Sequence, residues 1–332
     1  MQIARPISTD GDFAAVRALV ADDLNAVDTL IRSSLSSDVA LVSQVAEYIV
    51  GGGGKRLRPV VVLLSARALG CSGDAHHHLA AIIEFIHTAT LLHDDVVDGS
   101  ERRRGKATAN QVFGNQASVL VGDFLYSRSF QLMVALGRLP VMDILADATN
   151  TIAAGEVMQL MNVHNPETTE ARYREVIYRK TARLFEAGAE LGAVAADSDL
   201  RTRRALAVYG RELGVAFQLV DDLLDYTADA GEIGKNVGDD LAEGKPTLPI
   251  IRALATSSAL EQEFLRKVIV KGGRGDLDRV LSIVESTDAL QYTARRADEA
   301  AQAAIDALES IPESDFKQAL RTIAEFSVQR SH

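Results

Sequence analysis

Two short acidic segments, residues 94–98 and 221–225, have the same pattern in this chain: two aspartates, two apolar residues and a third aspartate. Each directly follows an apolar stretch whose composition suits a helix. Residues four apart lie on the same face of a helix, so the first and last carboxylates of each segment point the same way. Like charges at this spacing repel one another and destabilise the helix. The repeated pattern therefore predicts two helices whose carboxylates bind a cation; the alternative is a solvated acidic face.

The end of the first segment strengthens the case for a cation. Gly99 follows it at once and predicts the end of the helix. Three acids would then occupy a last turn, where the helix dipole favours Lys or Arg. Mg²⁺ is usually held by one or two carboxylates together with the phosphates of a substrate. The pattern therefore favours a Mg²⁺ site, with Mn²⁺ as an alternative ion, that binds a phosphorylated substrate.

The composition excludes several classes of protein. The chain has 332 residues, of which 47% are apolar and 24% charged, as in ordinary globular proteins. Its net charge of −11 argues against nucleic acid as a partner. We expect no transmembrane helix, because no apolar run approaches the roughly 20 residues that a bilayer requires. The single cysteine, Cys71, and the absence of a signal-peptide core favour the cytoplasm.

The remaining patterns predict an all-α protein. Apolar residues recur at spacings of three and four, for example in residues 79–86 and 203–213, and alternation with period two is scarce. Prolines fall near the ends of these stretches or between them. No linker rich in Pro, Gly or Ser divides the chain. We therefore expect a single all-helical domain over residues 1–332, a bundle in which both acidic segments face a central cavity.

Cations gather in loops and turns that suit an anion. Residues 51–59 join four glycines to three cations, and residues 227–247 form a Gly-rich basic loop after the second acidic segment. Glycines let backbone N–H groups approach an anion, and the cations neutralise it. Further cations lie in residues 101–106 and 178–183. Each could be a solvated turn by itself, but together with the acids they predict a diphosphate ligand.

In order and spacing, these motifs resemble those of the trans-prenyl diphosphate synthases. They are Gly-Gly-Lys-x-x-Arg-Pro at 53–59, the first acidic segment followed by Arg-Arg-Gly at 103–105, Lys-Thr at 180–181, Phe-Gln-x-x-Asp-Asp-x-x-Asp at 217–225, Gly-Lys at 234–235 and Gly-Lys-Pro-Thr at 244–247. Residues 83–98 and 155–161 are most similar to the bacterial members that make octaprenyl (C40) diphosphate.

The resemblance implies an isoprenoid-synthase fold and a prenyltransferase. Such an enzyme adds isopentenyl diphosphate head to tail to an allylic diphosphate, here to give a long all-trans chain for a quinone. Metal and cations stabilise the departing diphosphate, the double bond of isopentenyl diphosphate attacks the allylic cation, and a proton then leaves. The resemblance also implies a homodimer and a peripheral membrane contact for product release. The alternatives are a geranylgeranyl diphosphate synthase, a class I terpene cyclase and a non-catalytic synthase subunit.

The resemblance also assigns roles to individual residues. The metal ligands and their outer support would be Asp94, Asp95, Asp98, Asp221, Asp222 and Asp225. The allylic diphosphate would be bound by Arg103, Lys180, Lys235 and Lys245, and isopentenyl diphosphate by Lys55, Arg58, His87 and Arg104. Thr181 and Gln218 would flank the allylic C1–O bond and complete the catalytic set with Asp94, Asp98, Lys180 and Asp221.

Product length depends on residues upstream of the first segment. Ala89 lies five residues before Asp94, about 7.5 Å deeper along a helix. In this family a large aromatic side chain near that position blocks the growing tail. Ala89 and Thr90 are small, so a long channel past Ile86 is expected. Its floor would be Phe130 or Met133, and the sequence does not decide between them.

The three consecutive histidines at residues 76–78 invite a metal-site interpretation. Adjacent helical residues point in different directions, and the preceding residues suggest a turn. We therefore expect these histidines to be the solvated start of a helix.

Overall fold

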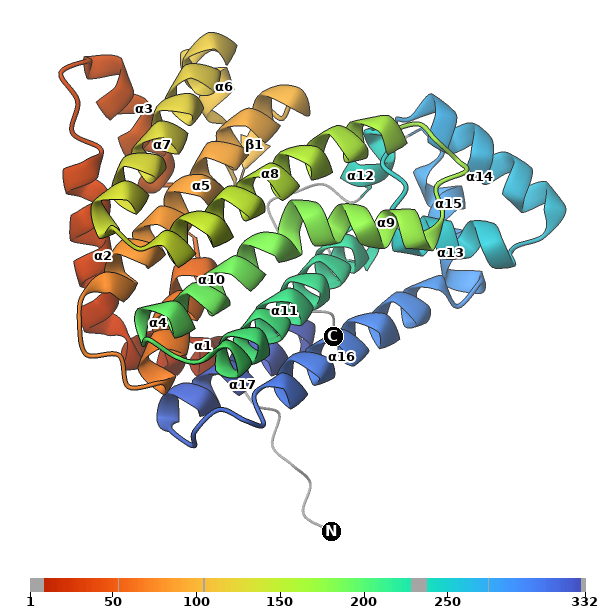
Figure 1. Ribbon diagram of the computed structural model, residues 1–332. Helices are drawn as coiled ribbons and strands as arrows, with labels where there is room; N and C mark the ends of the chain where they lie inside the picture. The colour runs from red at the N-terminus through yellow and green to blue at the C-terminus, as the bar shows by residue number, and fades with distance from the viewer. Residues whose placement is uncertain (1–8, 53, 104, 228–237, 274, 330–332) are drawn as a thin grey trace.

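The computed structural model describes residues 9–52, 54–103, 105–227, 238–273 and 275–329 (Figure 1). Most of them lie in helices. In chain order the elements are α1 (Thr9–Leu19), α2 (Ala21–Ser34), α3 (Ala40–Val50), α4 (Leu57–Ala68), α5 (Ala75–Val97), β1 (Arg102–Arg103), β2 (Lys106–Ala107), α6 (Ala109–Phe113), α7 (Asn115–Leu136), α8 (Leu139–Asn162), α9 (Glu170–Ile177), the π-helical turn η1 (Tyr178–Ala182), α10 (Arg183–Ala195), α11 (Leu200–Thr227), α12 (Asp239–Ala242), α13 (Leu248–Thr256), α14 (Ala259–Lys271), α15 (Leu277–Ser286), α16 (Ala289–Ala307) and α17 (Asp315–Gln329).

The predicted all-α class is confirmed, and the described residues add one short β-hairpin. β1 and β2 are antiparallel, with Arg103 opposite Lys106. Gly105 has a φ of +76° in the turn between them, a conformation that glycine adopts without strain. Because the hairpin begins soon after α5 ends, it fixes where Arg103 lies relative to the first acidic segment.

The main core surrounds α4, α5 and α10, which are buried over most of their length. Their apolar side chains form one cluster with those of α2, α7 and α17. Two glycines permit very close helix contacts. A Cβ on Gly192 of α10 would lie 2.5 Å from the Cβ of Ser65 in α4, and one on Gly210 of α11 would lie 2.3 Å from the carbonyl oxygen of Phe185. Interiors this dense resist displacement, so α4, α10 and α11 hold a fixed arrangement.

A smaller apolar cluster lies at the right-hand end of Figure 1, where α12 to α15 pack together. It includes Leu265, Ile269 and Val284. α16 connects the two clusters, because its Ala289 belongs to the smaller one and its Ala304 to the main core. The two clusters thus share one helix.

Both acidic segments lie at the C-terminal ends of helices. α5 ends at Val97 with Asp98 as its cap, and Gly99 follows with a left-handed φ of +63°. The glycine therefore ends the helix as predicted, because an L-residue is strained in that conformation. The second segment occupies the last turns of α11, which ends at Thr227.

The expectation of a solvated histidine run is wrong. His76 is fully buried, with its Nε2 3.3 Å from Oδ1 of Asp23, and Nε2 of His77 lies 2.7 Å from the same oxygen. Both rings reach one carboxylate because Asp23 of α2 lies against the first turn of α5. The guanidinium of Arg67 donates to both oxygens of Asp23. The cluster thus forms a hydrogen-bonded junction of α2, α4 and α5.

Helix α7 corrects a second expectation. By length and composition it is apolar enough to cross a bilayer, whereas we expected no such helix. The expectation counted uninterrupted apolar runs, and in α7 isolated polar residues separate the apolar ones. Little of the helix is buried: Leu120 is 66% exposed and Val134 60%. The helix therefore presents apolar side chains at the surface of the described chain.

Candidate functional site

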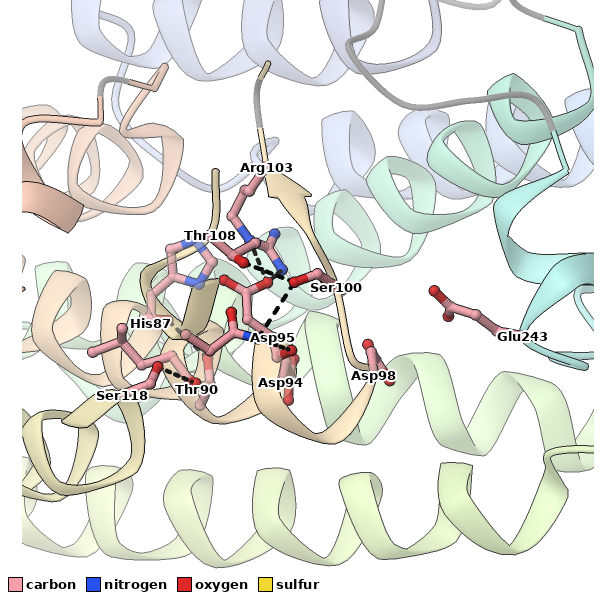
Figure 2. A network of polar contacts seen from close by, with 12 residues as sticks. His87, Thr90, Asp94, Asp95, Asp98, Ser100, Arg103, Thr108, Ser118 and Glu243 are labelled. Carbon is pink, nitrogen blue, oxygen red and sulfur yellow. Dashed lines mark hydrogen bonds and ion pairs between the residues drawn. The ribbon is translucent and has the colours of Figure 1, made fainter. Parts of the chain in front are cut away.

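The first acidic segment contacts two of the predicted phosphate-binding lysines. Asp94 and Asp98 lie one turn apart at the end of α5 (Figure 2). Lys180 Nζ lies 3.3 Å from Oδ2 of Asp94, and Lys245 Nζ lies 3.0 Å from Oδ2 of Asp98. Lys180 comes from η1 and Lys245 from the loop before α13. The fold therefore gathers three distant motifs at one place.

Each lysine is also held by an acid that the motifs do not contain. Lys180 Nζ donates to Glu156 at 2.5 Å and to Gln159 at 2.6 Å, both on α8, and Lys245 Nζ pairs with Glu243 at 2.6 Å. Sequence reasoning missed these three residues. Glu156 and Gln159 lie in a segment that we used only as a mark of resemblance, and Glu243 precedes the predicted Gly-Lys-Pro-Thr motif.

Burial shapes the electrostatics of this cluster. It raises the pKa of Asp94, and the nearby carboxylate of Asp98 raises it further, while Lys180 lowers it. Burial also raises the pKa of Glu156 to about 7. For Lys180, burial lowers the pKa, but the neighbouring carboxylates outweigh this effect and raise it. Ionising these buried carboxylates therefore costs free energy, and added positive charge would offset that cost. Paired oxygen ligands of this kind fit a hard divalent cation.

Asp95 faces a different direction from its neighbours. It is buried, and its Oδ1 accepts hydrogen bonds from Arg103 Nε at 2.9 Å and Nη2 at 2.7 Å. The hairpin that carries Arg103 is held to the end of α5 by Thr108, whose hydroxyl donates to the carbonyl of Ser100 at 2.7 Å (Figure 2). Asp95 therefore positions Arg103.

The aspartates of the second segment likewise differ in their surroundings. Asp222 is buried and accepts hydrogen bonds from the hydroxyl of Tyr173 at 2.5 Å and from Nε2 of Gln218 at 2.7 Å. Burial raises its pKa well above the ordinary range. Asp225 accepts the backbone N–H groups of residues 239 and 240 and so caps α12. Both suit outer support, and Asp221 beside them is only half-buried.

The π-helical turn η1 connects the two segments. Lys180 reaches the first segment, and the hydroxyl of the next residue, Thr181, donates to Oε1 of Gln218 at 2.8 Å. Gln218 in turn holds Asp222. A π-turn inserts one residue and changes which side chains share a face, and such turns are frequent at functional sites. Here it lets consecutive residues serve both acidic segments.

The predicted isopentenyl diphosphate residues lie beside this cluster. Arg58 Nη1 lies 3.2 Å from Nε2 of His87. His87 lines a shallow recess together with Arg56, Asp95 and Arg103. Lys55 precedes α4, and its side chain is exposed. The recess could hold a small anionic ligand next to the cluster of Asp94.

Two predicted cations lie outside the described residues, namely Arg104 and Lys235.

The residues predicted to control product length lie between α5 and α7. Ile86 and Ala89 are fully buried on α5. His93 follows Ala89 by one turn on the same face and packs against Gly122 of α7, where a Cβ would lie only 2.3 Å from His93 Nε2. This face of α5 therefore points toward α7. Thr90 is half-buried, and its hydroxyl donates to the carbonyl of His87 at 2.8 Å.

The structure separates the two candidates for the channel floor. Met133 is 1% exposed and lies about three turns from Gly122 on the same face of α7. Phe130 is 41% exposed and contacts Tyr126 on the surface. Met133 is therefore the enclosed candidate, and Phe130 points away from α5.

Comparisons with known proteins agree with this geometry. A model of the polyprenyl synthetase family matches residues 39–286. The octaprenyl diphosphate synthase of Escherichia coli (strain K12) is 52% identical over 316 residues, which cover 95% of this chain and 98% of that protein. An all-trans-nonaprenyl-diphosphate synthase (geranyl-diphosphate specific) of Rhodobacter capsulatus is 46% identical and covers 95% of this chain and 97% of its own length.

The fold has a solved counterpart. The crystal structure of a polyprenyl synthase from Caulobacter crescentus CB15, complexed with calcium and isoprenyl diphosphate, aligns with a TM-score of 0.93 and 43% identity. The alignment covers 99% of both chains. All the elements that carry the site therefore lie within the compared region.

Proposed function

Because the chain belongs to the polyprenyl synthetase family and is a trans-prenyltransferase, we propose that it extends an allylic diphosphate with isopentenyl diphosphate to octaprenyl (C40) diphosphate. Family membership confirms the resemblance predicted from the motifs and argues against a terpene cyclase. The observation that carries the proposal is the pair of lysine–aspartate contacts, Lys180 with Asp94 and Lys245 with Asp98. A departing diphosphate is stabilised where cations and a metal lie together.

The allylic diphosphate would bind at this pair. Asp94, Asp98 and Asp221 would hold Mg²⁺, which when bound supplies positive charge to the departing diphosphate. Lys180 and Lys245 would exchange their aspartate contacts for phosphate oxygens while Glu156 and Glu243 keep them in place. The calcium in the Caulobacter crescentus structure supports a divalent cation in this family. Mg²⁺ is our choice because its ligands are few carboxylates plus phosphates.

Isopentenyl diphosphate would bind in the neighbouring recess, without metal. His87 lines this recess, Arg58 contacts His87, and Lys55 lies in the loop before α4. Arg103 lies between the recess and the first segment, where it contacts Asp95. Thr181 and Gln218 would flank the allylic C1–O bond, because their hydrogen bond lies between the two acidic segments. This arrangement brings the two substrates side by side, as head-to-tail addition requires.

A long product follows from the wall of α5. Ala89 and Thr90 leave space that a large aromatic residue would fill, and the relatives from Escherichia coli and Rhodobacter capsulatus are named for long-chain products. The C40 product would serve as a quinone side chain. A geranylgeranyl product would require the channel to close much nearer to Asp94.

The direct test is product analysis. Purified protein is incubated with farnesyl diphosphate, isopentenyl diphosphate and Mg²⁺, and the dephosphorylated products are separated by reversed-phase chromatography. We expect C40, within a range of C35 to C50. Arrest at C20 would assign a geranylgeranyl synthase instead. Absence of any condensation would indicate a non-catalytic subunit and overturn the proposal.

The exposed apolar surfaces of α7 and α8 support a homodimer. The exposed apolar side chains on these two helices are Val119, Leu120, Phe130, Val134, Leu139, Met142, Val157, Leu160 and Met161. Exposed apolar side chains gathered on two consecutive helices are typical of a protein or membrane contact. Pairing with a second copy would bury it, and any remaining apolar surface would serve the peripheral membrane contact through which the product leaves.

A further inference from the structure

An aromatic pair from the two ends of the chain lies beneath Lys55. Phe13 of α1 and Phe326 of α17 stack with ring centroids 5.4 Å apart and planes inclined by 17°. Each ring is only 6% exposed, so both are fixed by packing. Lys55 Nζ lies 4.4 Å from the centroid of Phe326 and 5.6 Å from that of Phe13. Both distances lie within the range of cation–π attraction.

The residues on either side of Lys55 have unusual backbone conformations. Gly54 has a φ of +135°, a conformation that glycine favours, and Arg56 is in the left-handed region at +48°. Contacts with other elements help to hold them. Arg56 pairs with Asp28 of α2 on one side of Lys55, and the aromatic pair contacts Lys55 itself.

A ring face suits a lysine that must later bind a phosphate. The attraction comes from the ring quadrupole and leaves the ammonium its full charge. N–H groups directed away from the ring stay able to donate to an anion. A lysine side chain loses rotamer entropy when it binds a ligand, and the contact with the rings takes part of that loss before the ligand arrives.

We infer that Phe13 and Phe326 are positioning residues for Lys55 and so for isopentenyl diphosphate binding. The inference rests on the proposed function, because it needs Lys55 to contact that substrate. It makes the first and last described helices, α1 and α17, part of the substrate site. The aromatic pair should affect one substrate only, since the allylic diphosphate binds at Lys180 and Lys245.

The test separates the ring from the packing volume. Phe326→Leu keeps an apolar side chain but removes the ring, whereas Phe326→Tyr keeps the ring. We expect Phe326→Leu to raise the KM for isopentenyl diphosphate about three- to tenfold, the size of one cation–π contact. Its kcat and its allylic KM should stay within about twofold of wild type, because the ring acts only on Lys55. Phe326→Tyr should behave as wild type.

Two controls make the result specific. Phe264→Leu removes a ring that carries Arg279 at 3.9 Å in the α14–α15 region, and it should leave both KM values unchanged. Isothermal titration with isopentenyl diphosphate alone reports binding without turnover and should show the same weakening for Phe326→Leu. Melting temperatures check that each variant is folded.

A double-mutant cycle with Lys55→Ala shows whether the ring of Phe326 acts through Lys55. If the ring acts through Lys55, Phe326→Leu adds nothing once Lys55 is removed. An undiminished effect in the Lys55→Ala background would overturn the inference and leave the proposed function intact. The inference would also be overturned, with the proposed function intact, if Phe326→Leu left the KM for isopentenyl diphosphate unchanged while Lys55→Ala raised it. If Lys55→Ala itself leaves that KM unchanged, the assignment of Lys55 fails and the inference fails with it.

Discussion

At the scale of single residues, the site is a network in which motif and non-motif side chains share the charge. Lys180 links Asp94 to Glu156, and Lys245 links Asp98 to Glu243. The lysines thus lie where the phosphate oxygens of the substrate would bind. The glutamates would keep the lysines in place when the aspartates bind a metal.

Replacing Asp94 by Asn should therefore abolish most of the activity. The amide keeps the shape of the side chain but removes a charged ligand, and we expect the rate to fall at least about 10³-fold, or roughly 4 kcal/mol of transition-state stabilisation. Steady-state kinetics over a range of Mg²⁺ concentrations would measure it. Asp298→Asn, on the exposed face of α16, is the matched control. Full activity of the Asp94 variant, or of wild type in excess chelator, would contradict the metal assignment.

The buried histidine of the Asp23 cluster makes the protein sensitive to acid. Burial lowers the pKa of His76 below its ordinary 6.5, and the adjacent His77 adds to this effect. As the pH falls below about 6.5, the unfolded chain takes up this proton before the folded protein does, so stability decreases. The pKa of Asp23 is also lowered, because Arg67 and His77 outweigh the effect of burial. Its contribution is lost only at much lower pH.

The melting temperature should thus fall between pH 7 and pH 5. His76→Asn should flatten this slope, whatever it does to stability at neutral pH, because the titrating group is gone. His78→Asn, two residues further along α5, should leave the slope as in wild type. Circular dichroism melts at several pH values measure all three. Equal slopes for wild type and His76→Asn would show that His76 does not carry the effect.

At the scale of elements, α5 and α7 form the channel wall that should limit the length of the product. The face of α5 that carries Ala89 points toward α7, and Met133 is the enclosed residue further along α7. A packed wall does not yield readily to added volume.

Ala89→Phe should thus shorten the products to about C15–C20, because the ring fills the space that the tail needs. The first condensation should stay active, since Ala89 lies about 7.5 Å along α5 from Asp94. Ala89→Ser adds almost no volume and should keep the wild-type length. Thin-layer analysis of dephosphorylated products compares the three. Wild-type lengths from Ala89→Phe would place Ala89 outside the channel.

The contact of α8 with η1 is as tight as contacts in the core. A Cβ on Gly155 would lie 2.7 Å from the Cβ of Arg179 and 2.9 Å from the backbone nitrogen of Lys180. Since both are fixed atoms near the backbone, the π-helical turn would have to move.

Gly155→Ala should displace Lys180 and reduce kcat/KM for the allylic substrate about tenfold or more, because misplacement by about 1 Å can cost a hundredfold. Gly73→Ala is the matched control, as no atom lies within 4 Å of its added Cβ. Kinetics with each substrate varied in turn would show the loss. A normal allylic kcat/KM in a folded Gly155→Ala protein would mean that η1 tolerates the shift.

At the scale of the whole molecule, α7 and α8 carry most of the exposed large apolar side chains among the described residues. Its apolar side chains include Leu160 at 64% and Met161 at 66% exposure, close to the residues that hold Lys180. A dimer through this surface would lie directly behind the site.

Leu160→Glu combined with Met161→Glu should convert a dimer into a monomer, because it buries two charges in an apolar interface. Sedimentation velocity measures the mass. Leu260→Glu, at an equally exposed position on α14, should leave the dimer intact. If wild type is already monomeric, the proposed interface is wrong, and binding of α7 to lipid vesicles becomes the next measurement.

Much of this molecule could be predicted from the order of its residues. The motifs carry their chemistry in local spacing, so the aspartate segments, the Lys-Thr pair, the glycine stop after Asp98 and the all-α class were all predictable. Periodicity alone defines helices, and four-residue spacing alone brings carboxylates to one face.

Contacts between distant segments were not predictable, because nothing local records which side chains will meet. Glu156 and Glu243 join the site only where α8 and the loop before α13 approach the end of α5. His76 is buried because α2 brings Asp23 to it. Lys55 lies on an aromatic pair because α1 and α17, far apart in the chain, pack together beneath its loop. These pairings result from burial and long-range packing, which depend on the complete fold.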